Sequence, residues 1–198
     1  MTDTPKVANV LAVYNGAFAH HLRFGLQWYA IAHREAMRMG GGRAGHLERN
    51  AGIIAALSPM NAWDNNLAKA KELVSLRGRV VVEKGKPNGI GLGNNVAKAV
   101  AIYNGADPWD ILGGDKVRAF YATILNPNGD VNPVIDRHAF DIAVGERTDD
   151  KRRGILSRKG VYSEFAAVYR EAAKVAGIGS AQMQAITWVA WREALGIV

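Results

Sequence analysis

The sequence contains no cysteine, which excludes disulfide bonds and any cysteine-ligated zinc or iron–sulfur site. The five histidines, at positions 20, 21, 33, 46 and 138, do not follow a metal-binding spacing such as H-E-x-x-H. No apolar run reaches the roughly 18 residues that a membrane span needs. The N-terminus has a short apolar stretch and an early acidic residue, unlike a secretory signal. We therefore expect no cofactor, no metal and no membrane, and a soluble cytoplasmic protein.

Acidic residues are fewer than basic ones, and this imbalance indicates what kind of partner the protein could bind. The 25 Lys and Arg exceed the 18 Asp and Glu, so the formal net charge is +7. A positive surplus favours a polyanionic partner, with DNA as the first candidate, although a basic surface without a function is the alternative. A length of 198 residues with 48% hydrophobic residues fits one domain with a substantial core. We expect a single domain over residues 1–198, acting as a monomer.

Signals for β-structure are also scarce, and apolar residues at helical spacing dominate. The only candidate strand is Arg79–Glu83, within an expected loop over 77–93. The sequence predicts an all-α protein, and Ser180 is the expected N-cap of the last helix. A charged loop is expected over 145–160. The expected helices cover 5–39, with possible breaks at Gly16 and Gly25, then 46–58 up to Pro59, a helix from about 61, 94–103, a turn at 108–112, 116–125, a helix after Asp136, one from about 162 to Gly177, and 181–196.

The segment from Ile111 to Val144, ILGGDKVRAFYATILNPNGDVNPVIDRHAFDIAV, carries the candidate chemistry. Gly113 and Gly114 form a turn between two helices, where exposed backbone N–H groups can bind a phosphate oxygen. The alternative is a plain turn with Asp115 as helix cap. Asp136 precedes an apolar-periodic run and therefore begins a helix, as an N-cap or as a catalytic carboxylate beside a breaking glycosidic bond. Lys116 lies 136 − 116 = 20 residues before it and could form a Schiff base.

These motifs resemble the helix-hairpin-helix DNA glycosylase superfamily of endonuclease III and 8-oxoguanine glycosylase. The resemblance rests on G-x-K-V-x-A-F, on V-I-D-x-H, on GIIAALSPMNAWDNNLAKA (52–70) and on IGLGNNVAKAVAIYNG (90–105), and it covers roughly residues 47–145. It implies a two-lobed helix-hairpin-helix glycosylase-like fold, with the helix-hairpin-helix region at about 108–145. It also implies Lys116 as a possible Schiff-base nucleophile and Asp136 as the catalytic carboxylate. The C-terminal segment QAITWVAWRE is similar to small phage-encoded members, which would place the protein in the host cytoplasm.

Further residues are candidates for DNA contact, each with a structural alternative. His138 would lie on the first turn after Asp136, and Arg118 and Arg137 flank the two catalytic candidates as possible phosphate contacts or solvated side chains. Trp63 with Asn61, Asn65 and Asn66 could contact bases, or Trp63 could belong to the core. Trp188 and Trp191 are expected to pack. The basic loop residues Lys151, Arg152 and Arg153, with Arg158 and Lys159, are expected to meet DNA.

Three functions stay open at this point. The first is excision or processing of a damaged or modified base, including an enzyme of phage thymine hypermodification. The second is a catalytically inert DNA-binding module, and the third is a phage protein that binds a host protein. The turn from Leu112 to Lys116 is two residues shorter than L-P-G-x-G-x-K, which favours the inert module, whereas the presence of both Lys116 and Asp136 favours the enzyme.

Overall fold

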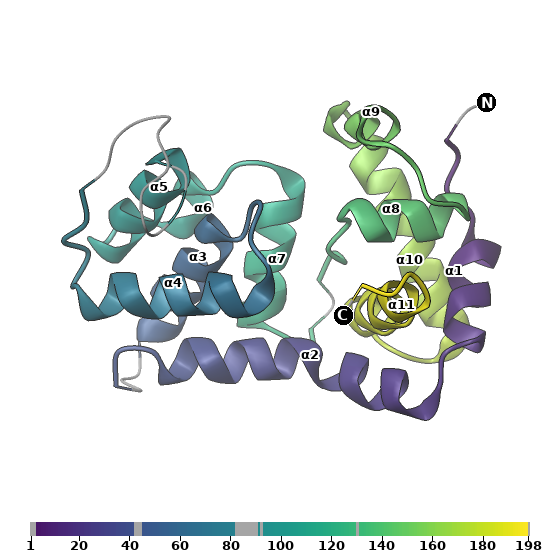
Figure 1. The fold of residues 1–198 in the computed structure, drawn as a ribbon, viewed down its shortest axis with the longest axis horizontal. Coiled ribbons are helices and arrows are strands. Elements are labelled where there is room, and N and C mark those ends of the chain that lie inside the picture. The colour runs from purple at the N-terminus through teal and green to yellow at the C-terminus, as the bar shows by residue number, and fades with distance from the viewer. Residues whose placement is uncertain (1–2, 42–44, 82–90, 92, 130, 198) are drawn as a thin grey trace. The chain divides into compact units, whose positions relative to one another are not determined.

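The computed structural model describes residues 3–41, 45–81, 91, 93–129 and 131–197, and every regular element in these ranges is a helix (Figure 1). The expected all-α class is confirmed. The chain forms two compact units: unit 1 is Met1–Ile31 with Asn126–Val198, and unit 2 is Ala32–Leu125. The predicted helix-hairpin-helix region, 108–145, is thus divided between the units. Among the described residues, none of the helices combines the length and apolarity that crossing a bilayer would require.

Unit 1 is built around α8, whose buried side chains pack against α10 and α11. Phe140 of α8 stacks on Phe165 of α10 with ring centroids 4.7 Å apart, and both rings are fully buried. Tyr169 donates its hydroxyl to the carbonyl of Ala139 at 3.0 Å, which joins α10 to α8 a second time. The elements are α1 (Val7–Asn15), the first part of α2 (Ala19–Arg38), α8 (Arg137–Val144), α9 (Asp150–Arg153), the 3-10 helix η1 (Gly154–Ser157), α10 (Val161–Ala176) and α11 (Ser180–Ala194).

Unit 2 encloses the apolar helix α3. All residues from Asn50 to Leu57 are buried, because α3 is covered by α4, α5 and α7. The Pro59 stop predicted from the sequence is confirmed, since α3 ends at Leu57. The elements are the end of α2, α3 (His46–Leu57), α4 (Trp63–Ser75), α5 (Gly93–Tyr103), α6 (Pro108–Ile111) and α7 (Asp115–Leu125). Residues 79–81 are not a strand, and the rest of the candidate strand lies outside the described residues.

The expected break at Gly16 is confirmed and the one at Gly25 is wrong. The first helix ends at Asn15 and α2 begins at Ala19, whereas Gly25 lies inside α2. A Cβ on Gly25 would lie 2.5 Å from the Cα of Ile186 in α11. Glycine is therefore used here for a close approach of two helices rather than to interrupt one of them.

The charged loop expected over 145–160 is also wrong, because α9 and η1 occupy its middle. Asp149 begins α9 as N-cap and accepts the N–H of Arg152 at 2.8 Å. The predicted N-cap role of Ser180 is wrong as well. Gly179 is the N-cap, its N–H donates to the side chain of Gln182, and the Ser180 hydroxyl donates to the carbonyl of Val131 at 2.8 Å.

Candidate active site

Asp136 begins α8, as the sequence predicts, and its carboxylate is held by three donors. Oδ1 accepts the backbone N–H of His138 at 3.0 Å and that of Ala139 at 2.8 Å. Oδ2 accepts the indole Nε1–H of Trp188 at 3.0 Å. The side chain is half-buried. Both oxygens are thus oriented by N–H groups, which fix the direction in which the carboxylate faces.

The indole of Trp188 is itself held by neighbouring side chains. The guanidinium of Arg192 lies 4.3 Å from the ring centroid, close enough for a cation–π contact. The ring of Trp28 packs at 5.5 Å with an interplanar angle of 34°, and the ring of His138 meets Trp188 edge-on at 6.4 Å. Sequence reasoning assigned packing to Trp188 and missed its hydrogen bond, because no local pattern shows which group a tryptophan 52 residues away will reach.

His138 lies buried beside this carboxylate. Its Nε2 is 3.3 Å from the Nε of Arg137 and accepts that N–H, so the ring proton belongs on Nδ1. Nδ1 has no hydrogen-bond partner among the described residues. Burial lowers the pKa of His138 below 6.5, and Arg137 and Arg192 lower it further, while the charge of Asp136 opposes the shift. His138 is therefore held neutral at neutral pH.

The segment that leads into Asp136 is fixed by the buried Tyr162, and a second buried tyrosine lies in the same unit. Tyr162 accepts the N–H of Ile135 and donates to the carbonyl of Pro133, both at 3.0 Å. Tyr29 donates to the side chain of Gln184 at 2.6 Å. Burial raises the pKa of Tyr29 well above its usual value, and the charge of Asp136 adds to this. The carboxylate thus sits on a rigid frame within unit 1.

The turn that carries Lys116 belongs to unit 2. Gly114 adopts a left-handed φ of 78°, and Gly113, Gly114 and Lys116 are exposed. The side chain of Arg118 is used inside this hairpin: Nε donates to the carbonyl of Leu112 at 2.8 Å and Nη2 to that of Trp109 at 2.9 Å. Arg118 therefore joins α7 to the end of α6, which is a structural role that the sequence left open.

A lysine that sequence reasoning did not select lies near this turn. A Cβ on Gly113 would be 3.8 Å from the Nζ of Lys98, which comes from α5. The ammonium group, the exposed glycine backbone and the start of α7 are thus neighbours. A cation beside free backbone N–H groups is a suitable arrangement for a phosphate oxygen.

The loop between α3 and α4 presents a large apolar side chain to solvent. Met60 is 93% exposed and has a left-handed φ of 66°. Asn61 stabilises this loop, because its Nδ2 donates to the carbonyl of Leu57 at 2.7 Å and its Oδ1 accepts from Asn65 and Lys69. Trp63 packs against the core of unit 2, and the amide of Asn66 donates to the carbonyl of Ile54.

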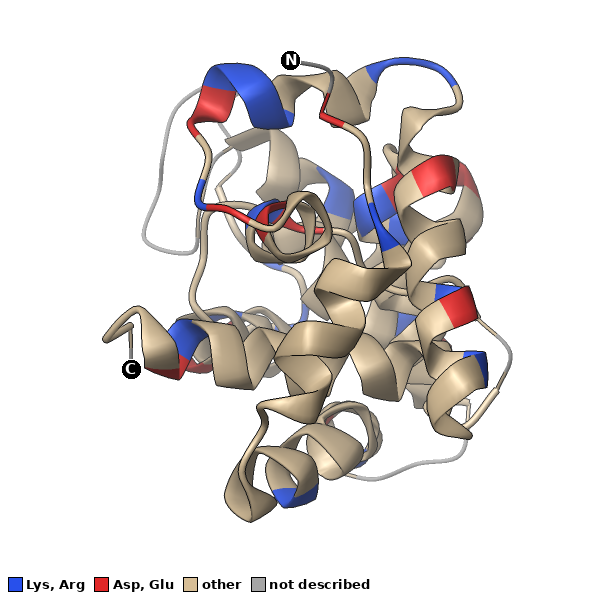
Figure 2. Ribbon diagram, turned by 90° about the vertical axis from the view of Figure 1, so that its right-hand side faces the viewer, with Lys and Arg blue, Asp and Glu red and all other residues tan. Residues whose placement is uncertain are grey.

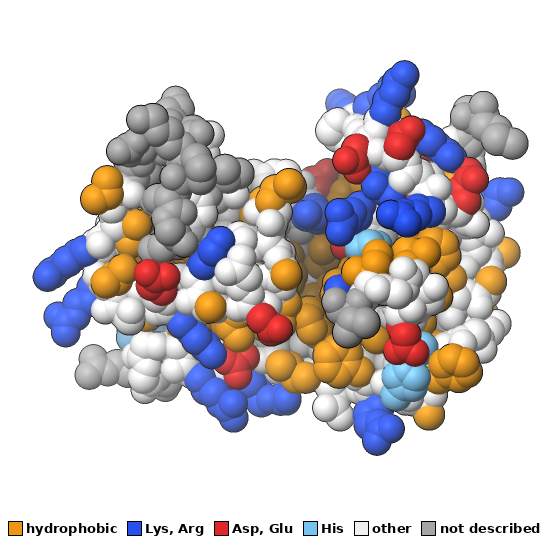
Figure 3. Space-filling view, viewed as in Figure 1, with side chains coloured by type: hydrophobic (Ala, Val, Ile, Leu, Met, Phe, Trp, Pro, Cys, Tyr) orange, Lys and Arg blue, Asp and Glu red, His pale blue; other side chains and the backbone are white. Residues whose placement is uncertain are grey.

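The basic residues after Gly145 are partly neutralised within the chain. Arg152 forms ion pairs with Asp3 and Glu146, and Arg153 pairs with Asp141 and Asp150. In Figure 2, acidic and basic segments stand next to one another in this upper part of the chain, and in Figure 3 blue side chains gather over α8 and α9. Lys151 is exposed and has no partner among the described residues.

A candidate metal site requires three ligand atoms, and one such group exists in unit 1. Atoms of His20, His21 and Glu193 lie within 4.8 Å of one another. However, His21 Nδ1 accepts the N–H of Phe18 at 3.0 Å, so a neutral ring keeps its proton on Nε2. A metal-bound imidazole needs the opposite tautomer. The hydrogen bond from His20, with His21 close by, lowers the pKa of Glu193, and we describe the group as a carboxylate between two imidazoles.

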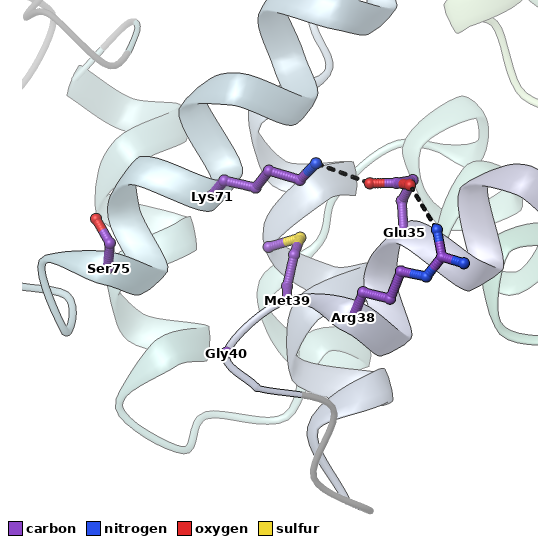
Figure 4. Close-up of a pocket in the computed structure, with 6 residues that line it drawn as sticks. All are labelled: Glu35, Arg38, Met39, Gly40, Lys71 and Ser75. Carbon is purple, nitrogen blue, oxygen red and sulfur yellow. Dashed lines mark hydrogen bonds and ion pairs between the residues drawn. The ribbon is translucent and has the colours of Figure 1, made fainter.

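A surface hollow of about 510 Å³ lies in unit 2 (Figure 4). Glu35 points toward Lys71 and Arg38 there, with ion-pair distances of 2.7 and 3.6 Å. The hydrogen bond from Lys71 lowers the pKa of Glu35. Since the charges satisfy one another, we assign no ligand to this hollow. It is lined by Glu35, Arg38, Met39, Gly40, Lys71 and Ser75.

The residues proposed for the site fall into two groups. Asp136, Arg137 and His138 lie together in unit 1, whereas Lys116 and Gly113–Gly114 belong to unit 2. The joint action of Lys116 and Asp136 therefore stays a prediction.

Comparison with known proteins identifies a family but not an activity. The chain belongs to a family of unknown function, DUF7178, whose model matches residues 1–195. A search of curated proteins found no match, and no solved structure matched the chain either.

Proposed function

We propose that this protein binds DNA and excises or processes a damaged or modified base, with Asp136 as the catalytic carboxylate. The observation that carries the proposal is the carboxylate at the start of α8, held by two backbone N–H groups and one indole N–H. When a glycosidic bond breaks, positive charge develops on the sugar, and a fixed carboxylate stabilises that charge. The V-I-D-R-H motif around Asp136 supports the same role through its resemblance to the glycosylase superfamily.

We assign phosphate binding to the turn after α6. The exposed Gly113 and Gly114, the start of α7 and the nearby Lys98 support contact with the DNA backbone, independently of sequence. The proposed fold is accordingly a two-lobed helix-hairpin-helix glycosylase-like one. Lys116 lies on the first turn of α7, and its proposed role is to attack the sugar as a Schiff-base nucleophile.

The loop at Met60 supports contact with an opened duplex. Apolar side chains that insert between base steps are common in proteins that distort DNA, and Met60 is almost fully exposed on a loop fixed by Asn61. A monomer acting on one flipped nucleotide is the proposed form. Such a protein works where DNA is, in the cytoplasm, or in the host cytoplasm if its gene is phage-borne.

A second candidate is a DNA-binding module without catalysis. The exposed position of Lys116 favours it, because a Schiff-base lysine is typically activated by desolvation in an apolar pocket. An enzyme of phage thymine hypermodification is a variant of the first proposal, with the same carboxylate acting on a modified base.

Borohydride trapping on a panel of damaged and modified oligonucleotides tests the proposal. We expect base release from at least one oligonucleotide, and a covalent adduct if Lys116 acts as nucleophile. Lys116→Gln should then abolish the adduct, while base release survives in part if water can replace the lysine. Binding to DNA with no base release from any member of the panel would leave only the inert module.

A further inference from the structure

The indole of Trp188 is the one side-chain donor to the Asp136 carboxylate among the described residues. Oδ1 is already occupied by the N–H groups of His138 and Ala139. Oδ2 receives only the indole Nε1–H, at 3.0 Å. The direction of the second oxygen therefore depends on Trp188, which comes from α11 rather than from α8 itself.

The ring of Trp188 is restrained by three neighbouring side chains. Arg192 lies over the indole at 4.3 Å, Trp28 packs against it at 5.5 Å, and His138 meets it edge-on. A donor fixed in this way needs no reorganisation when charge develops in front of the carboxylate, which is the condition under which hydrogen bonds contribute most to catalysis.

We propose that Trp188 is the positioning residue of this site and that it makes Asp136 a fixed anion rather than a proton acceptor. This inference rests on the proposed function and specifies its chemistry. The C1′–N bond breaks first, and its electron pair leaves with the base. The carboxylate faces the resulting cationic sugar. Where water rather than Lys116 is the nucleophile, it then supplies hydroxide to C1′ and a proton to the base, so the net reaction is hydrolysis of an N-glycoside.

Trp191 provides a matched control three residues further along α11. Its buried Nε1 has no hydrogen-bond partner among the described residues. Replacing either tryptophan by phenylalanine removes an indole N–H, but only Trp188→Phe removes one that is bound to Asp136. Arg192→Gln is a milder variant, because it uncovers one face of the Trp188 ring and leaves the N–H in place.

Turnover of the oligonucleotide found in the trapping panel measures the role. We expect Trp188→Phe to lower kcat roughly 10- to 100-fold, the loss expected for one hydrogen bond to a charged group, with KM unchanged. Trp191→Phe should keep kcat within about twofold of the wild-type value. The kcat of Arg192→Gln should lie between those of Trp188→Phe and Trp191→Phe. Equal kcat values for Trp188→Phe and Trp191→Phe, or a change in KM alone, would overturn the positioning role.

An activity-independent measurement keeps the test valid if Trp188→Phe does not fold. In ¹H–¹⁵N spectra of the indole groups, Asp136→Asn should move the Trp188 resonance and leave that of Trp191 in place. An unchanged Trp188 resonance shows that Trp188 does not hold Asp136, and this inference then fails alone. If the resonance moves but no oligonucleotide loses a base, the proposed function fails, and the catalytic part of this inference fails with it.

Discussion

Arg153 and Asp141 form a two-point ion pair in which the carboxylate is 1% exposed. Nε donates to Oδ1 at 3.1 Å and Nη2 to Oδ2 at 2.7 Å. The Thr148 hydroxyl and N–H also donate to Oδ1. The hydrogen bond to Asp141 raises the pKa of Arg153. This pair joins α8 to α9 and compensates the cost of burying a charge.

Arg153→Gln should therefore lower the free energy of unfolding by about 3–5 kcal/mol, since it leaves a buried carboxylate without its cation. Urea unfolding followed by circular dichroism measures this. Lys151→Gln, two residues earlier and exposed, should change stability by no more than about 0.5 kcal/mol. Similar stabilities for the two variants would show that Arg153 is not structural.

DNA affinity should fall steeply with salt, because the net charge of +7 favours phosphate contacts that release counterions. We expect Lys151, Arg158 and Lys159 to contribute to this effect, because they are exposed in unit 1, whereas Arg152 and Arg153 are paired within the chain. A triple Gln variant at the three exposed positions should reduce the slope of log K against log salt by up to about 0.9 per lost contact. Lys174→Gln, at an exposed position of α10, is the control. Binding that is flat between about 50 and 200 mM salt would remove nucleic acid as the partner.

Local sequence patterns predict most of the helices, but they predict the candidate site only in part. Apolar spacing, Pro59 and the Asp136 cap are local signals, and the structure agrees with all three. The hydrogen bond from Trp188 and the pairing of Arg152 with Asp3 join residues 52 and 149 positions apart. Such contacts depend on tertiary packing, and the spacing of residues along the sequence does not predict them.

The same reason explains why the sequence predicts a charged loop where α9 and η1 form. A run of basic residues is typical of a solvated surface, and nothing in the run shows that Asp141 is buried and lies within reach of Arg153. Gly25 is comparable, because a glycine inside a helical pattern signals either a break or a close approach, and the choice depends on Ile186 in a distant helix.

Gly25→Ala should destabilise the protein, although alanine is the better helix former. The added methyl would lie 2.5 Å from the Cα of Ile186, and separating α2 from α11 should cost about 1–3 kcal/mol. Gly154→Ala is the control, because that glycine has φ −57° and an added Cβ would have no neighbour within 4 Å. Thermal unfolding midpoints of both variants show whether Gly25 serves the close approach of two helices. A Gly25→Ala protein at least as stable as the wild type would mean that the two helices are not in close contact.

Stability should decline as the pH falls from about 7 to 5, in part through His138. The folded-state pKa of His138 is lowered from 6.5, mainly by burial, so the unfolded chain binds a proton in a range where the folded chain does not. The contribution of a neutral His138 is therefore complete above pH 6.5 and decreases below it. His138→Gln should flatten the decline measured by urea unfolding at a series of pH values, whereas His46→Gln serves as the comparison. An equally steep decline in His138→Gln would assign the effect to other groups.

Asp136→Asn should nearly abolish turnover of whichever oligonucleotide is processed while leaving DNA affinity similar or higher. The variant removes the negative charge that faces the developing cation, and losing one such electrostatic contact typically costs on the order of 10²–10³ in rate. Asparagine is itself a good N-cap, so α8 should still form, although the indole of Trp188 loses its charged acceptor. Asp107→Asn is the matched control, because Asp107 caps α6 by accepting the N–H of Trp109 at 2.8 Å and has no proposed catalytic role. Single-turnover rates and binding curves for both variants separate chemistry from affinity. Full activity of a stable Asp136→Asn protein would mean that Asp136 is only a helix cap, and the proposed glycosidic chemistry would then be wrong.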